Sequence, residues 1–260
     1  MDEPKESIID IKGLSTRFGS QIIHENLSLQ VQRGEILAIV GGSGSGKTTL
    51  LREMVMLQSV FAGSIRIFGE EIVGMGLADK KRLQQRWGVM FQSGALFSGL
   101  TVLQNVCFPL CEFTHLSEAD IDAIGLLKIK LANLPATSAH LFPAELSGGM
   151  IKRAAVARSI AMDPELLFVD EPTAGLDPES ASDFDELVLQ LRASLGLTVI
   201  IITHDMDTLW RVPDRVAFLG QKRVLAVQPI RELVKNPEPL IQAYFSTPRA
   251  RAAVPVGDKS

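Results

Sequence analysis

The chain is 260 residues long, with 46% hydrophobic residues, 22% charged residues and a formal net charge of −4. This length is sufficient for one sizeable hydrophobic core. The mildly acidic balance argues against a broad surface for nucleic-acid phosphates, so no nucleic-acid partner is expected. No apolar run approaches the roughly 18 residues that cross a bilayer, and the first residues lack the apolar stretch of a signal peptide. We therefore expect a soluble, cytoplasmic chain.

Two kinds of strand pattern follow one another along the chain. Hydrophobic and polar residues alternate at 7–14, 21–31 and 64–68, which predicts antiparallel strands at one edge of the fold. Short, continuously apolar runs predict parallel strands that are buried on both faces. Helical patterns separate several of these runs, as a parallel sheet requires, and the predicted fold class is therefore α/β with a mostly parallel core sheet. The apolar runs lie at residues 36–40, 89–91, 166–169, 198–202 and 216–219.

Residues 93–162 differ from the rest of the chain because they contain helical patterns and no convincing strand. The clearest helical patterns lie at 119–130 and 148–161. We expect an all-helical subdomain inserted between two strands of the sheet. The core and the antiparallel part would then comprise residues 6–92 and 163–235.

These parts together predict a single domain from residue 6 to residue 235, followed by a C-terminal tail at 236–260. In the tail the composition shifts towards Pro, Ala and Arg, and the chain ends with the residues Pro-Val-Gly-Asp-Lys-Ser. We expect the tail to be flexible or extended over a partner.

The cysteines and three of the histidines show no catalytic or metal-binding spacing. Cys107 and Cys111 are the only cysteines, and they lie four residues apart in an apolar stretch with no second ligand pair. We expect two buried, reduced thiols. For His24, His115 and His140 we expect structural or solvated roles.

A glycine-rich segment with the pattern Gly-x-x-x-x-Gly-Lys-Thr follows the apolar run at 36–40 and precedes a helical pattern at 49–57. Glycines allow backbone amides to turn towards phosphates, and a helix N-terminus adds partial positive charge. Lys47 is expected to reach the β- and γ-phosphates, and the Thr48 hydroxyl to ligate magnesium. The expected phosphate-binding residues are Gly41, Gly42, Ser43, Gly44, Ser45, Gly46, Lys47 and Thr48.

Two carboxylates follow the apolar run at 166–169, at the carboxyl end of a predicted buried strand. Active groups gather at this end of the strands in open α/β sheets. Asp170 suits magnesium coordination, directly or through water. Glu171 is placed to polarise a water in line with the γ-phosphate, which makes it the expected general base.

The residues Leu-Ser-Gly-Gly-Met at 146–150 predict a second helix N-terminus that binds an anion. Ser147 stands at the N-cap position, and Gly148 and Gly149 leave the following amides uncovered. The helical insertion is expected to hold this helix away from the phosphate loop of the same subunit. We therefore expect a head-to-tail homodimer in which the helix that begins at Ser147 contacts the nucleotide bound by the partner subunit.

Three further polar residues follow predicted strands or the carboxylate pair. Gln92 is expected to sense magnesium or the attacking water through its amide. The imidazole of His204 can hydrogen-bond the γ-phosphate. Asp177 lies on a loop shortly after Glu171. Together with Lys47, the residues Gln92, Glu171 and His204 form the expected catalytic group.

These motifs together resemble those of the ATP-binding-cassette ATPases over about residues 6–235. The resemblance implies a P-loop NTPase fold with ATP and Mg²⁺ as cofactors. Phe18 occupies the usual position of the aromatic residue that stacks on adenine, and Met150 stands where Gln is commoner. The resemblance assigns the Walker A motif to 41–49, including Thr49, and the Walker B strand to 166–170. It makes Glu171 the catalytic base, Gln92 the Q-loop glutamine and His204 the switch histidine. The signature motif is then 146–150 and the D-loop residue is Asp177. The metal ligands that it implies are Thr48, Gln92 and Asp170.

A narrower resemblance rests on Phe-Gln-Ser-Gly-Ala-Leu-Phe at 91–97, Asn-Val at 105–106 and the signature at 146–150. These segments are similar to those of the ATPase subunits of MCE-type phospholipid transporters. The resemblance implies a homodimer bound peripherally to the cytoplasmic face of the inner membrane. It also implies as partners an integral membrane permease, an MCE lipid-binding subunit and a small STAS-domain subunit.

The apolar loop that follows Gln92, at 93–109, is predicted to form much of the groove that receives a cytoplasmic helix of the permease. An amino-acid or other small-solute importer is the main alternative, because cassette subunits rarely contact the cargo. A DNA- or ribosome-associated cassette ATPase is disfavoured by the single phosphate loop and by the lack of a heptad insertion. Intact Glu171 and His204 argue against a module that holds ATP without hydrolysing it.

Overall fold

The computed structural model describes residues 6–254, which form two compact units. The first unit comprises residues 6–80 and 200–254, and the second comprises residues 81–199. The expected absence of a signal peptide concerns residues that lie outside the described part. Within 6–254, no helix combines the length and the hydropathy that a membrane span needs.

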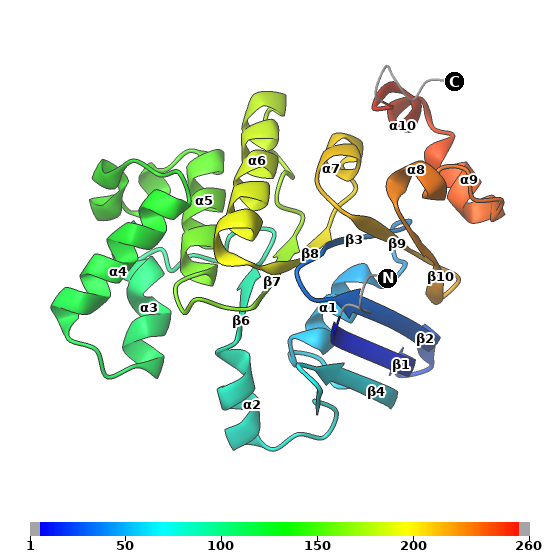
Figure 1. Cartoon of the computed structure of the whole chain (residues 1–260), viewed down its shortest axis with the longest axis horizontal. Helices are drawn as coiled ribbons and strands as arrows, with labels where there is room; N and C mark the ends of the chain where they lie inside the picture. Colours follow the sequence, from blue (N-terminus) through cyan, green and yellow to red (C-terminus); the bar gives the residue numbers. More distant parts are fainter. Residues whose placement is uncertain (1–5, 255–260) are drawn as a thin grey trace. The chain divides into compact units, whose positions relative to one another are not determined.

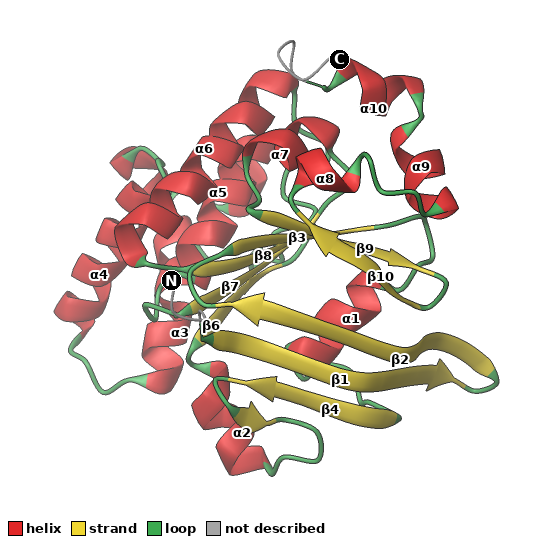
Figure 2. Ribbon diagram, turned by 45° about the vertical axis from the view of Figure 1, so that its right-hand side comes forward, coloured by secondary structure: helices red, strands yellow, loops and turns green. Residues whose placement is uncertain are grey.

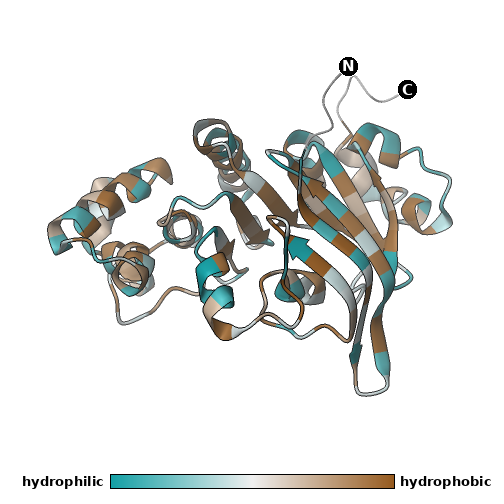
Figure 3. Ribbon diagram, turned by 60° about the horizontal axis from the view of Figure 1, so that its bottom comes forward, coloured by the Kyte–Doolittle hydropathy of each residue, from teal (hydrophilic) through white to brown (hydrophobic). Residues whose placement is uncertain are grey.

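In the first unit the N-terminal strands form an antiparallel sheet with the order β2-β1-β4-β5 (Figure 2). Its strands are β1 (Ser7–Phe18), β2 (Gln21–Gln32), β4 (Ala62–Ile67) and the short β5 (Glu70–Glu71). Hydrophobic and hydrophilic residues alternate along the long strands (Figure 3). The alternation buries one face of the sheet, and the three predicted antiparallel strands are confirmed.

The phosphate loop of the first unit follows the fully buried strand β3 (Ile36–Val40) and leads into helix α1 (Lys47–Met54). Strand β3 pairs in parallel with β9 (Arg215–Gly220), which in turn pairs antiparallel with β10 (Arg223–Gln228). Both β3 and β9 were predicted from their apolar runs. Strand β10 carries an apolar run at 224–227 but is only partly buried, and the sequence analysis did not predict it.

Most of the expected tail is folded in the structure. Helices α9 (Pro239–Phe245) and α10 (Pro248–Ala252) follow α8 (Ile230–Leu233). Ile241 and Phe245 are buried in one hydrophobic cluster of the first unit. The expectation of a flexible segment is therefore wrong for 239–252, because a few apolar residues at helical spacing suffice to dock short helices on an existing core. Residues 255–260 lie outside the described part.

The second unit contains a parallel strand pair and several helices. Strand β6 (Trp87–Met90) pairs in parallel with β7 (Leu166–Asp170), and β8 (Thr198–Ile202) spans the boundary between the units. Strands β7 and β8 match the predicted apolar runs, whereas β6 begins two residues before the run predicted at 89–91 and ends at Met90. The helices α3, α4 and α5 pack against one another (Figure 1). The helices are α2 (Leu77–Gln84), which also crosses the boundary, α3 (Val102–Phe113), α4 (Glu118–Leu131), α5 (Gly148–Ser159) and α6 (Pro178–Leu195).

Helix α3 corrects two expectations. The segment 93–109 was treated as one apolar loop, but residues 102–109 belong to α3, which begins with a capping box at Thr101. Of the two thiols, Cys107 is buried and Cys111 is exposed. Residues four apart on a helix differ by about 40° in direction, and this rotation turns Cys111 out of the buried stripe. Burial raises the pKa of Cys107 to about 11.

Candidate functional site

The phosphate loop at 41–48 in the first unit is closed by its own lysine. The Nζ of Lys47 donates hydrogen bonds to the carbonyl oxygens of Gly41, at 2.9 Å, and of Gly42, at 3.1 Å. Gly46 caps α1 with a φ of 97°, in the left-handed region that favours glycine. At Gly41, a Cβ would lie 2.2 Å from the carbonyl oxygen of Leu219. The loop therefore presents a helix N-terminus and a cation, which is the chemistry of a phosphate site.

A buried polar cluster lies beside this loop. The Thr16 hydroxyl donates to Oε1 of Glu53, and Nδ1 of His24 lies 3.0 Å from Thr16 Oγ1 and 3.2 Å from Glu53 Oε2. The side chains of His24 and Glu53 are completely buried. Nε2 of His24 faces Gly46. The expected structural role of His24 is thus consistent with its burial, although the sequence analysis identified neither Thr16 nor Glu53.

The carboxylate pair of the second unit stands at the end of β7. Asp170 is the last residue of this fully buried strand and is itself 6% exposed. Glu171 is partly exposed and has a φ of 47°, an uncommon backbone conformation for a residue other than glycine. Both carboxylates thus emerge where a buried strand meets a turn, as the sequence predicts.

Helix α5 begins at the predicted N-cap. The Ser147 side chain accepts a hydrogen bond from the backbone amide of Met150, and Gly148 and Gly149 form the first turn. The amides of Gly148 and Gly149 thus lie at a helix N-terminus, which is where an anion can bind. The side chain of Met150 is partly buried against the hydrophobic cluster between α3, α4 and α5. In this chain Met150 contributes to the packing of the helical part.

The remaining expected site residues divide between the two units. In the first unit, Phe18 ends β1 with 46% of its surface exposed, and His204 is exposed just after β8. In the second unit, Gln92 is exposed just after β6. Asp177 caps α6 by accepting hydrogen bonds from the amide and the hydroxyl of Ser180, at 2.9 and 2.6 Å, and these bonds lower its pKa.

One residue that the sequence analysis missed connects two of these positions. Lys152, on α5, donates to the carbonyl oxygens of Gln92 and Glu171. Its position after the signature motif was the only available signal. Lysine on an amphipathic helix is usually solvated, whereas Lys152 is 6% exposed.

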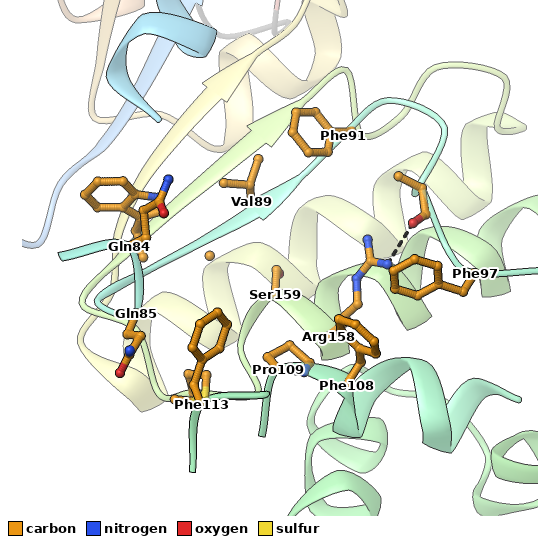
Figure 4. A pocket seen from close by; sticks show the side chains of 14 residues that line it. Gln84, Gln85, Val89, Phe91, Phe97, Phe108, Pro109, Phe113, Arg158 and Ser159 are labelled. Atoms are coloured by element: carbon orange, nitrogen blue, oxygen red, sulfur yellow. Dashed lines mark hydrogen bonds between the residues drawn. The ribbon is translucent and has the colours of Figure 1, made fainter. Parts of the chain in front are cut away.

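An apolar pocket of about 390 Å³ lies within the second unit (Figure 4). The rings of Phe97 and Phe108 pack at 4.8 Å between their centroids. Arg158 lies beside them and donates to the carbonyl oxygens of Gly94 and Ala95, at 2.8 and 2.7 Å. The other lining residues include Trp87, Val89, Phe91, Pro109, Phe113 and Met162.

Comparison with known proteins agrees with this site chemistry. The family model described as ABC transporter matches residues 24–174, which is more than half of the chain. The chain therefore belongs to the ABC transporter family, and it is an ATP-binding-cassette ATPase with a P-loop NTPase fold. The predicted enzyme class and fold class are confirmed.

Named relatives align over most of the chain. It is 38% identical over 231 residues to the intermembrane phospholipid transport system ATP-binding protein MlaF of Haemophilus influenzae, covering 89% of this chain and 87% of the relative. MlaF of Escherichia coli K12 is 36% identical, with 94% and 91% covered. The "Probable ribonucleotide transport ATP-binding protein mkl" of Mycobacterium leprae is 34% identical, with 98% and 72% covered.

Solved cassettes have the same fold. A dimeric structure of the ATP-binding cassette MJ0796, in a post-hydrolysis state bound to ADP and Pi, matches with a TM-score of 0.78 and 28% identity, covering 85% of this chain and 98% of that one. The cassette cbiO1 of Clostridium perfringens, part of the transporter complex cbiONQ, matches with a TM-score of 0.81 and 28% identity, covering 94% and 97%.

Proposed function

We propose that this ATPase drives the transport of phospholipids as the motor subunit of an MCE-type system. The observation that carries the proposal is the similarity to MlaF from two organisms, at 36–38% identity over about nine-tenths of the chain. The predicted phospholipid-transport motifs at 91–97 and 146–150 support it, because the first of them contributes to the apolar pocket and the second opens α5.

The proposed nucleotide contacts use the chemistry of each residue. The amides of 41–48 and Lys47 bind the phosphates, Phe18 stacks on adenine, and Thr49 adds a contact in the first turn of α1. Oxygen ligands suit Mg²⁺, and Thr48, Gln92 and Asp170 offer a hydroxyl, an amide oxygen and a buried carboxylate. When bound, Mg²⁺ neutralises the charge that develops on the phosphoryl oxygens.

For hydrolysis, we assign proton abstraction from water to Glu171. His204 donates a hydrogen bond to the γ-phosphate, and Gln92 orients the attacking water. In the proposed homodimer, Ser147, Gly148, Gly149 and Asp177 of one subunit complete the nucleotide site of the other. The dimeric MJ0796 cassette, which was solved with ADP and Pi, supports this arrangement.

The apolar pocket is the proposed docking place for a cytoplasmic helix of an integral membrane permease. Phe97, Phe108 and Phe113 line this pocket and are 38–48% exposed, and a cluster of exposed apolar side chains is typical of a surface that a partner covers. Docking would place the subunit at the cytoplasmic face of the inner membrane. The MCE lipid-binding subunit and a STAS-domain subunit are proposed as further components of the assembly.

The decisive experiment reconstitutes the chain in proteoliposomes with a permease and an MCE subunit from the same organism. ATP-dependent transfer of a fluorescent phospholipid is expected, and Glu171→Gln should abolish it. In the Glu171→Gln variant ATP binding should persist, hydrolysis should stop and a nucleotide-bound dimer should accumulate. Unchanged hydrolysis would overturn the role of Glu171.

A small-solute importer is the second candidate, because the similar mycobacterial protein mkl carries a ribonucleotide-transport name. The same proteoliposomes can be loaded with radiolabelled ribonucleotides or amino acids. Uptake of such a solute without phospholipid transfer would favour this candidate.

A further inference from the structure

Lys152 is a buried cation that contacts the backbone of two proposed catalytic residues. Its ammonium group donates to the carbonyl oxygen of Gln92 and, at 3.2 Å, to that of Glu171. Burial of a charged group is unfavourable unless hydrogen bonds replace its water. The two carbonyl oxygens supply this replacement. Burial lowers the pKa of Lys152, while the carboxylates of Glu171 and Asp170 act in the opposite direction.

The two carbonyls belong to neighbouring strand ends of the second unit. Gln92 comes two residues after β6 and Glu171 directly follows β7, and these strands pair in parallel up to Met90 and Val169. Lys152 therefore connects the second turn of α5 to the backbone just beyond the carboxyl ends of two adjacent strands. Because one ammonium group contacts both carbonyl oxygens, it restricts the distance between Gln92 and Glu171.

The conformation of Glu171 explains why such a contact matters. Its φ of 47° is unfavourable for a side chain with a Cβ, and surrounding contacts must hold it. Its carbonyl oxygen accepts from the amide of Ala174, at 3.3 Å, and from Lys152. Loss of the ammonium group would remove one of these two bonds.

We propose that Lys152 is a positioning residue for ATP hydrolysis: it holds the backbone of Glu171 and of Gln92 against α5, the helix that begins at Ser147. The inference rests on the proposed function, in which Glu171 is the general base. Because α5 also presents its N-terminal amides, Lys152 ties the geometry of the base to the helix that contacts nucleotide in the proposed dimer. A displacement of the base by a fraction of an ångström slows proton transfer more than it weakens binding of ATP.

The test uses the full-length chain with Lys152→Met, which keeps the length of the side chain and removes the ammonium group. Lys130→Met, on the exposed surface of α4, is the matched control. We expect Lys152→Met to lower kcat per bound ATP by about tenfold or more, with KM and the Kd of ATP within about twofold. Lys152→Arg should recover much of kcat, because it restores a cationic donor. Lys130→Met should behave as the parent.

The split between kcat and KM separates positioning from a merely structural role. A structural defect would lower Tm and the fraction of chains that bind ATP, so kcat is normalised to bound ATP. An unchanged normalised kcat in Lys152→Met, or a parallel loss of ATP affinity, would overturn the inference. If the Met variant does not fold, Lys152→Leu, which also lacks a donor, replaces it, and a normalised kcat equal to that of Lys152→Arg would be the contradicting result.

Glu171→Gln, measured alongside, keeps this inference distinct from the proposed function. Full hydrolysis in Glu171→Gln would overturn the assignment of the general base. Loss of hydrolysis in Glu171→Gln combined with parental kcat in Lys152→Met would overturn the positioning role alone.

Discussion

Nε2 of His24 occupies the space where a side chain on Gly46 would begin. A Cβ atom at Gly46 would lie 2.4 Å from Nε2, far closer than van der Waals contact allows. His24 is completely buried and is held by Thr16 and Glu53, so the ring has little freedom to move away. The end of the phosphate loop is therefore shaped both by its own backbone conformation and by a ring from β2.

Gly46→Ala should weaken ATP binding by at least about tenfold, because a left-handed conformation costs a residue with a Cβ about 1–2 kcal/mol and the His24 ring adds a clash. The measurement is the Kd of a fluorescent ATP analogue. Gly34→Ala is the matched control, since Gly34 also has a positive φ, of 77°, but has open space around it. Equal affinities in Gly46→Ala and the parent would contradict the expectation.

The buried contact between His24 and Glu53 should appear as a coupling energy. Glu53→Leu leaves a buried imidazole without its carboxylate and should destabilise the fold by about 1–3 kcal/mol. The His24→Leu/Glu53→Leu double variant should cost less than the sum of the single variants, by at least about 1 kcal/mol. Urea unfolding without nucleotide measures the cycle. Glu25→Leu, on the exposed face of β2, is the control. If the changes in the free energy of unfolding for the His24 and Glu53 variants were strictly additive, the two side chains would not interact.

The C-terminal helices should contribute to stability. Phe245→Ala removes a buried ring from the cluster that also contains Ile241, and it should cost about 3–5 kcal/mol in urea unfolding. Leu240→Ala is the control on the same helix, because Leu240 is 41% exposed and should cost less than about 1 kcal/mol. Similar small effects at both positions would show that α9 is not part of the cooperative fold.

The apolar pocket gives a prediction about assembly. Phe108→Asp should reduce co-purification of the permease at least about tenfold, since a charge would be buried in an apolar interface. The Kd of ATP should stay within about twofold of the parent. Leu127→Asp, on the exposed surface of α4 and outside the pocket lining, should leave co-purification intact. If both variants retain the permease equally, docking occurs on another surface.

Much of the fold could be predicted because its signals are local. The predicted bounds of β3, β7 and β8 agree with the observed bounds to within one residue. A strand that is buried on both faces is a continuous run of apolar residues, and such a run is easy to delimit in the sequence. Ser147 was recognised as an N-cap from its own segment. By contrast, α3 was missed: its largely apolar stretch contains Pro109, which is disfavoured inside a helix, and its start is marked only by Thr101 and Gln104.

The sequence by itself determined the family, the phosphate loop, the carboxylate pair and the signature helix, because each is encoded by residues that are close together in the chain. Only the tertiary structure decided which distant residues support them. The carbonyl contacts of Lys152 reach 60 residues back to Gln92 and 19 residues forward to Glu171. The contact of Thr16 with Glu53 spans 37 residues. Such contacts leave no periodic pattern, since they arise when packed elements exclude water and a buried polar group must find its partner wherever the fold places one.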